Sequence, residues 1–358
     1  MKRESKTALL IDIGSGTRDI LLFQTGKTLE NSVKIVAPTA TLKFSREIKK
    51  ENRDIKIAGY TMGGGPLSNA LSDHLKKGFK IHIEPQAAFT VRNNLKELVE
   101  SGFEIHEHIT SPDYFFDEIE LSKIERTLSD FGMDSLEYSL IGLSVQDHGN
   151  HEPEQSSREK RFDCFLELLK EKRDLRSLIF TDKDTPEFFS RMQSGIACIQ
   201  KTRPDVPMII MDTCISAITG CWFDENIRNE AGPMLYLNFG NGHTLAAIVE
   251  NTEILAIYEH HTGLIKNRIE VLENHLLKLI SGNLKQREVF EDGGHGCQTF
   301  RSIDFAQITR IVITGPNRYL GKKLSFEKSY EASPAGDMMM TGPLGLLRGY
   351  ELKHGQAL

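Results

Sequence analysis

A carboxylate followed by a short glycine-rich turn stands near the start of the chain. Asp12 lies at the end of an apolar segment, residues 8–13, and the turn after it consists of Gly14, Ser15, Gly16 and Thr17. Backbone N–H groups in a turn without bulky side chains can surround phosphate oxygens. The carboxylate can hold a hydrated Mg²⁺ through its water ligands. The alternative is an ordinary hairpin in which glycine supplies a positive φ.

A second turn of the same design lies at residues 238–244. Asn238 precedes it, and the turn contains Gly240, Asn241, Gly242, His243 and Thr244. Its simpler interpretation is a tight Asn-Gly hairpin. Between the two turns, Asp212 follows the apolar segment 207–211 and precedes a run of small residues. This pattern predicts a helix that begins with an aspartate cap and packs closely against a partner helix.

Several histidines stand next to glycines or in glycine-containing turns at expected strand ends. They are His148, His243, His260, His261 and His295, and Asp147 and Glu259 adjoin two of them. Neutral imidazoles and carboxylates that converge can bind a transition metal or line an anionic substrate site. None of them has the spacing that fixes two ligands on one helix face. A contact with substrate or phosphate is therefore the first expectation, and a transition-metal site at His148, His260, His261 and His295 is the alternative.

The elements that must position these residues alternate between strands and helices. Apolar segments at residues 8–13, 20–23, 138–145 and 207–211 predict strands of the first half, and residues 234–239, 244–249, 254–258 and 311–314 predict strands of the second half. Further short strands are expected at residues 55–60, 79–83 and 103–106. Because a glycine turn between two strands occurs near the start of each half, we expect an internal duplication in an α/β protein.

Composition excludes several classes of protein. The 358 residues carry 44 Lys and Arg against 50 Asp and Glu, a net charge of −6, which disfavours nucleic acid as a partner. No apolar run approaches the ~18 residues of a membrane span, so no membrane partner is expected. The five cysteines are dispersed, without a C-x-x-C pair, which favours a reducing, cytoplasmic location.

The order of these segments resembles the actin, hexokinase and heat-shock-chaperone ATPase superfamily. Five short nucleotide motifs of that superfamily have counterparts in order: the first phosphate motif at 12–17, the first connecting helix at 212–221, the second phosphate motif at 238–244, the adenosine motif at 312–316 and the second connecting helix at 336–349. The resemblance spans nearly the whole chain. It implies an actin-like ATPase (ribonuclease H-like) fold of class α/β, with two related domains around an interdomain nucleotide cleft.

A narrower resemblance rests on short strings at residues 60–66, 242–244, 259–263, 293–296 and 337–339. They look like a prokaryotic family whose members often carry the label pyruvate formate-lyase-activating-like. That label implies a radical enzyme in which three cysteines hold an iron–sulfur cluster. The dispersed cysteines do not provide such a set, so we expect the family and not the radical S-adenosylmethionine activity.

The superfamily resemblance implies roles for individual residues. Asp12 would organise the Mg²⁺ through water, and Asp212 matches the aspartate that acts as catalytic base in related carbohydrate kinases. The nucleotide would contact Gly14, Ser15, Gly16, Thr17, Gly240, Asn241, Gly242, His243, Thr244 and Gly315. Asn238 departs from the aspartate that opens the second phosphate motif of chaperone-type ATPases, whereas kinase-type relatives tolerate a neutral residue there.

These expectations combine into one hypothesis and two alternatives. The hypothesis is an ATP- and Mg-binding phosphotransferase or ATPase that acts on a small molecule, with a first domain at 1–225 and a second at 226–358, whose last helix, about 338–353, returns to the first. One alternative is a non-enzymatic nucleotide-dependent switch or assembly module. The other is a metal-dependent phosphohydrolase that uses the cleft histidines.

Overall fold

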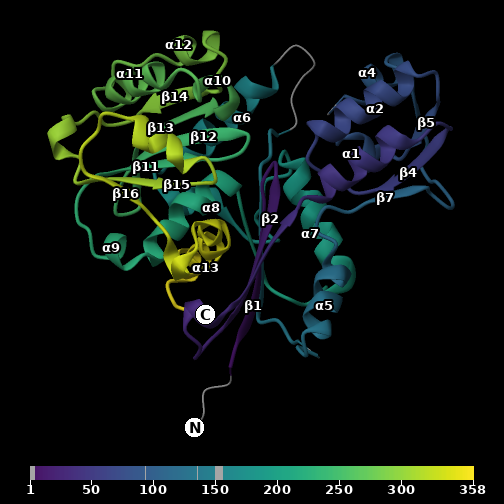
Figure 1. Ribbon diagram of the computed structural model, residues 1–358, viewed down its shortest axis with the longest axis horizontal. Helices are drawn as coiled ribbons and strands as arrows, with labels where there is room; N and C mark the ends of the chain where they lie inside the picture. The colour runs from purple at the N-terminus through teal and green to yellow at the C-terminus, as the bar shows by residue number, and fades with distance from the viewer. Residues whose placement is uncertain (1–4, 93, 135, 150–155) are drawn as a thin grey trace.

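The computed structural model describes residues 5–92, 94–134, 136–149 and 156–358 (Figure 1). Its strands form two six-stranded mixed sheets and one four-stranded parallel sheet. The first sheet contains β1 (Thr7–Ile13), β2 (Thr17–Gln24), β3 (Val33–Pro38), β8 (Leu140–Val145), β9 (Ile179–Phe180) and β10 (Met208–Met211). The second contains β11 (Met234–Phe239), β12 (His243–Glu250), β13 (Glu253–His261), β14 (Gly296–Thr299), β15 (Arg310–Thr314) and β16 (Ser329–Glu331).

The two large sheets repeat one topology. In each, three antiparallel strands in sequence are followed by two strands that run parallel to the first of them. The strand order β3-β2-β1-β8-β10 in the first sheet matches β13-β12-β11-β15-β16 in the second, and β9 and β14 are added at opposite edges. The predicted actin-like α/β fold with two related halves is therefore confirmed.

Helices cover both faces of each large sheet. The helices of the described chain, of which α1 to α4 belong to the small lobe described below, are α1 (Ala40–Lys50), α2 (Pro66–Lys76), α3 (Pro85–Ala88), α4 (Leu95–Glu100), α5 (Leu121–Asp130), α6 (Ser157–Leu169), α7 (Ser190–Thr202), α8 (Thr213–Gly220), α9 (Glu225–Arg228), α10 (Thr262–Ile265), α11 (Ile269–Ile280), α12 (Gln286–Glu291) and α13 (Thr341–His354). Helices α8 and α13 lie between the two sheets, whereas α5 and α7 cover the outer face of the first sheet (Figure 1). Among the described residues, no helix combines the length and the apolar character needed to cross a membrane.

Strand β1 shows how the sequence builds this layered core. Successive side chains of a strand point to opposite faces, so Ala8 and Leu10 pack toward α8 and α13 while Leu9, Ile11 and Ile13 pack toward α5 and α7. All five side chains are buried. A strand that is apolar on both faces belongs in the middle of a sheet covered on both sides. The parallel pairing of β1 with β8 is consistent with this, because parallel strands occur in such covered sheets.

The third sheet forms a separate small lobe, residues 40–116, between β3 and α5. Its strands are β4 (Ile55–Gly59), β5 (Ile81–Ile83), β6 (Phe103–Ile105) and β7 (Tyr114–Phe116). They pair in the order β6-β5-β4-β7 and, with α1 to α4, enclose a hydrophobic core of their own. The strands expected near residues 55–60, 79–83 and 103–106 are present, but they pair with one another and not with the first large sheet.

Glycines allow α8 and α13 to cross at close range. A Cβ atom on Gly345 of α13 would lie 2.8 Å from the Cα atom of Ser216 in α8, and one on Gly220 would lie 2.7 Å from the backbone nitrogen of Gly345. The Ser216 hydroxyl also donates a hydrogen bond of 2.6 Å to the carbonyl oxygen of Gly342. This contact joins the helix that follows β10 to the helix that ends the second half.

We expect Gly345→Ala to lower the free energy of unfolding by about 1–3 kcal/mol, because the added methyl group must push the two helices apart. Denaturant unfolding followed by circular dichroism measures the change. Gly263→Ala in α10 is the matched control, since a Cβ atom there meets nothing within 4 Å. Equal stability of Gly345→Ala and the control would contradict the close crossing.

Candidate functional site

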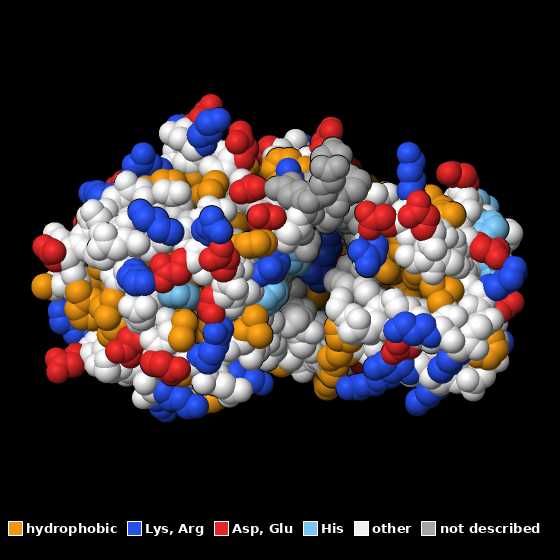
Figure 2. Space-filling model, turned by 90° about the horizontal axis from the view of Figure 1, so that it is seen from above, with side chains coloured by type: hydrophobic (Ala, Val, Ile, Leu, Met, Phe, Trp, Pro, Cys, Tyr) orange, Lys and Arg blue, Asp and Glu red, His pale blue; other side chains and the backbone are white. Residues whose placement is uncertain are grey.

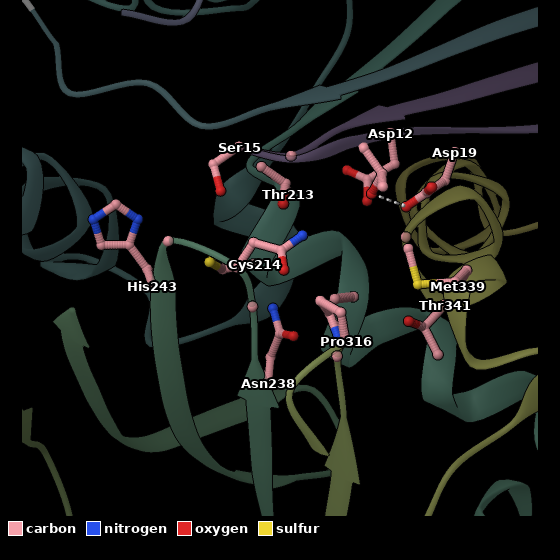
Figure 3. Close-up of a pocket in the computed structure, with 18 of the residues that line it drawn as sticks. Asp12, Ser15, Asp19, Thr213, Cys214, Asn238, His243, Pro316, Met339 and Thr341 are labelled. Atoms are coloured by element: carbon pink, nitrogen blue, oxygen red, sulfur yellow. Dashed lines mark hydrogen bonds between the residues drawn. The ribbon is translucent and has the colours of Figure 1, made fainter. Parts of the chain in front are cut away.

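A cavity of about 60 Å³, called here the hairpin cavity, lies where the two halves meet. Figure 3 shows its lining side chains, with Asp12 and Asp19 at one end and His243 at the other. Its walls come from the turn after β1, the start of α8, the turn after β11, the segment after β15 and the start of α13. The lining residues that the sequence predicted for nucleotide or Mg²⁺ are Asp12, Gly14, Ser15, Thr17, Gly240, Asn241, Gly242, His243 and Gly315.

The two glycine turns have the same backbone geometry. The N–H of Gly14 donates to the carbonyl oxygen of Thr17 at 3.0 Å, and the N–H of Gly240 donates to that of His243 at 2.9 Å. Each bond closes a hairpin between the first and second strand of its sheet. The duplication therefore extends from the strand order to the hydrogen bonds of the turns.

The tips of the two turns face each other. A Cβ atom on Gly16 would lie 2.7 Å from Nδ2 of Asn241, and one on Gly242 would lie 3.2 Å from Oγ of Ser15. The backbone N–H groups of these four residues have no hydrogen-bond partner within the described part of the chain. Unpaired N–H groups that converge from two turns are suited to bind an anion.

Asp12 and Asp19 are directly opposite each other in the β1–β2 pairing, and both are buried. The hydroxyl of Ser144 donates to Oδ1 of Asp12 at 2.5 Å, and Thr17 donates to Oδ2 of Asp19 at 3.4 Å. Burial raises the pKa of Asp12 to about 7. Burial, and next the charge of Asp12, raise the pKa of Asp19 to about 8.

This carboxylate pair has the chemistry of a divalent-cation site. Oδ1 of Asp19 is buried and has no hydrogen-bond partner among the described residues. Mg²⁺ is usually held by one or two carboxylates together with phosphate oxygens and water. Asp12 and Asp19 therefore fit a Mg²⁺ ion at the end of the hairpin cavity.

A fully buried arginine joins the two halves. Arg161 of α6 donates to Oδ2 of Asp212 at 2.7 Å and to Oε2 of Glu259 at 2.9 Å. Burial alone would raise the pKa of Glu259, but the Arg161 guanidinium holds it below its ordinary value. Since Glu259 lies on β13 and the other two residues lie in the first half, this ion-pair triad fixes the halves relative to each other.

Asp212 is the N-cap residue of α8, as the sequence predicted. Its Oδ1 atom accepts a hydrogen bond from the N–H of Cys214 at 2.9 Å as well as one from Arg161 at 3.1 Å. Asp212 lines neither the hairpin cavity nor the larger cavity described below. Its role as catalytic base stays a prediction.

Histidine rings from both halves gather next to the hairpin cavity. The nearest ring nitrogens of His148, His243 and His295 lie within 4.8 Å of one another. The ring of His261 lies 4.7 Å from those of His243 and His295. His260 is directed elsewhere, because its Nε2 atom lies 3.2 Å from Asp292 and its ring stacks on Tyr258.

A second, wider cavity of about 730 Å³ lies between the small lobe and these histidines. The space-filling view shows a hollow between the small lobe and the rest of the molecule, with histidine and basic side chains at its edge (Figure 2). The small lobe contributes Gly63, Gly64, Gly65 and Pro66 at the start of α2, and the other wall includes His148, Arg191 and His261. The two cavities share Gly14, Ser15, Gln146 and His243.

The structure places two predicted contacts outside the cavity lining. Gly16 lies in the contact between the turns, and the Thr244 hydroxyl is 2.9 Å from that of Thr262 inside the second half. Sequence reasoning missed Asp19, Arg161 and Gln146. For Asp19 a signal existed, since a hairpin closed at residues 14–17 puts Asp19 opposite Asp12. No local pattern marks the other two.

The duplicated sheets and the cavity between the two turns define an actin-like ATPase fold. A sequence model described as "Putative pyruvate format-lyase activating enzyme (DUF1786)" matches residues 62–320. The chain therefore belongs to this family, which confirms the family resemblance seen in the sequence. A comparison with curated proteins finds no match.

Several solved structures are similar over most of the chain. The ethanolamine utilization protein EutJ from Carboxydothermus hydrogenoformans has 9% identity and a TM-score of 0.32, covering 97% of this chain and 90% of its own. The psk41 ParM protein has 14% identity and a TM-score of 0.34, covering 98% of each chain. Acetate kinase from Entamoeba histolytica has 10% identity and a TM-score of 0.35, covering 88% of this chain and 85% of its own.

The cysteines do not fit the cluster that the family description implies. All five are buried with free thiols. No cysteine belongs to either group of three metal-ligating side chains found in the described ranges. A radical enzyme needs three thiolates that converge on one iron–sulfur cluster, and the cysteines of this chain do not fit that cluster.

We expect Asp19→Asn to stabilise the protein increasingly as pH rises from about 4 to 8 in buffer containing EDTA. In the folded protein the raised pKa of Asp19 lets it keep its proton to about pH 8, whereas the unfolded chain loses this proton near the ordinary pKa of 3.8. The wild type therefore loses stability over this interval. At pH 8.5 the gain should exceed about 1.4 kcal/mol, the equivalent of one pKa unit.

Urea unfolding at a series of pH values measures this difference. Asp130→Asn, at an exposed position in α5, is the control and should leave the profile unchanged. A difference between Asp19→Asn and wild type that does not grow with pH would contradict the buried, protonated state of Asp19.

Proposed function

We propose that this protein binds Mg-ATP between the two glycine turns and acts as a phosphotransferase or ATPase on a small molecule. The observation that carries the proposal is that all five segments predicted as nucleotide motifs contribute to one small cavity. The unpaired N–H groups of Ser15, Gly16, Asn241 and Gly242 would donate to phosphate oxygens. Gly315, which lines the same cavity, would border the adenosine.

Asp12 and Asp19 would hold the magnesium ion. Bound there, the ion would neutralise phosphate charge during transfer. The Ser144 hydroxyl orients the Asp12 carboxylate, and Asp19 retains a carboxylate oxygen without another partner among the described residues. Because the pKa values of both carboxyl groups are raised, these groups would release protons when the cation binds.

The wide cavity would hold the molecule that receives the phosphoryl group. Its 730 Å³ lies within the roughly 300–1,000 Å³ typical of small-molecule sites. It meets the hairpin cavity at Ser15 and His243, where the terminal phosphate would lie. The hairpin cavity, at about 60 Å³, is too small for a nucleotide as it stands, so binding would require the two turns to move apart.

A second candidate function is a nucleotide-dependent switch without phosphoryl transfer. It is favoured by one observation, the engagement of both Asp212 oxygens by Arg161. Phosphate release from ATP under single-turnover conditions separates the two candidates. Loss of turnover in Asp212→Asn with unchanged ATP affinity supports a role of Asp212 as general base, which typically contributes about 10²–10⁴-fold to the rate. ATP binding without turnover in the wild type supports the switch.

We expect Mg-ATP to raise the melting temperature, because a ligand selective for the folded state adds about 2.7 kcal/mol at 100 times its Kd. Asp12→Asn should remove the Mg²⁺ dependence of this rise, since it removes one charge from the cation site. Differential scanning fluorimetry with ATP, with and without Mg²⁺, measures both effects. Asp130→Asn serves as the exposed control, and a wild-type protein whose melting temperature does not respond to Mg-ATP would contradict the proposal.

A further inference from the structure

His295 is buried without any polar partner. Its side chain has no exposed surface, and neither Nδ1 nor Nε2 has a hydrogen-bond partner among the described residues. An unsatisfied buried donor or acceptor costs about 1–3 kcal/mol. The imidazole rings of His148, His243 and His261 lie beside it, at ring distances of 6.1, 4.7 and 4.7 Å. A metal ion bound by several imidazoles would give His295 the partner that its ring nitrogens lack.

The three rings that come closest belong to segments far apart in the chain. His148 follows β8 in the first half, His243 begins β12, and His295 precedes β14. Their ligand atoms lie within 4.8 Å of one another, and two nitrogens on one ion are separated by up to about 4 Å when each bond is 2.0–2.1 Å. Small side-chain rotations would therefore bring all three nitrogens onto one ion.

Charges of both signs lie near the three rings. His148 and His243 are half-buried and His295 is buried, and burial disfavours the charged imidazolium, so the rings favour the neutral form that binds metals. The triad of Arg161, Asp212 and Glu259 adds a net charge of −1 beside them. Arg158 and Arg191 also act on these rings, and Arg191 is paired with Glu118.

A neighbouring amide holds one of the rings. Oε1 of Gln146 lies 2.8 Å from Nδ1 of His243. Nε2 of the same amide lies 3.4 Å from Nε2 of His243. With Nδ1 donating to the amide oxygen, Nε2 is the nitrogen that would bind an ion, in place of this long contact, and such second partners commonly orient metal-bound imidazoles. Gln146 is one of the residues shared by the two cavities.

We propose that His148, His243 and His295 bind one divalent transition-metal ion whose remaining coordination position faces the wide cavity. Three histidines with one open position are typical of catalytic sites, and imidazole ligands suit zinc, iron, nickel or copper. His148 and His243 line the wide cavity, whereas His295 closes the site from behind. The open position would take water or an oxygen atom of an anionic small molecule. This site is separate from the carboxylate pair proposed for Mg²⁺ and does not depend on it.

A second group in the chain provides a matched control. His82 on β5, Glu104 on β6 and His106 just after β6 also place ligand atoms within 4.8 Å of one another. This group lies at the surface of the small lobe, and its members already pair, with 3.0 Å between His82 Nδ1 and His106 Nε2. Its ligands are satisfied without an ion, whereas His295 is not.

The test is titration of EDTA-treated, full-length protein with Co²⁺ alone, followed by its visible absorption. We expect one Co²⁺ per chain with the intense bands of a four-coordinate site, and a loss of affinity of more than about 100-fold in His148→Asn and in His295→Asn. His82→Asn and Asp19→Asn should leave the bands unchanged. Circular dichroism verifies folding, and His148→Asn, whose side chain is only half-buried, keeps the test decisive if His295→Asn does not fold.

Azide added to the Co²⁺ protein probes the open position. A shift of the bands supports an exchangeable ligand on the side of the wide cavity, and unchanged bands would contradict the open position. The metal site itself is overturned if the wild type shows no four-coordinate Co²⁺ bands, or if His148→Asn retains them. Because the readout uses no nucleotide, failure of ATP binding would not affect it.

Discussion

The placement of the two halves depends on one buried cation, Arg161. Its guanidinium binds Asp212 of the first half and Glu259 of the second, and it also donates to the carbonyl oxygen of Asp147 at 2.7 Å. Burial of a charge is costly unless ion pairs and hydrogen bonds compensate it, and removal of one partner from such a pair costs about 3–5 kcal/mol. The same side chain therefore fixes the start of α8, the end of β13 and the segment that carries His148.

Two kinds of metal-binding chemistry meet along this boundary. The carboxylates of Asp12 and Asp19 lie at one end of the hairpin cavity, and His243 lies at the other (Figure 3). Hard carboxylate oxygens suit Mg²⁺, whereas neutral imidazoles suit transition metals. The unpaired N–H groups of the two turns lie between these ends. In this account the turns bind phosphate, and the histidines face the molecule in the wide cavity.

The sequence allowed much of this arrangement to be predicted, because the turns and their flanking strands are local patterns. Duplication then implied that the turns after β1 and β11 are related. Tertiary contacts were not predictable in this way: Arg161 stands in an ordinary helical pattern. The distinction between His260 and His261 was accessible, since adjacent residues of a strand point to opposite faces. The short strands of the small lobe were visible, but parallel strands of three to five residues carry no local signal of their partners.

The most direct test of the central claim is a crystal structure of the protein with Mg²⁺ and a non-hydrolysable ATP analogue. The account predicts the triphosphate between the turns after β1 and β11, in contact with the N–H groups of Ser15 and Gly242, with Mg²⁺ beside Asp12 and Asp19 and the adenosine near Gly315. A nucleotide whose phosphates contact neither turn would contradict it.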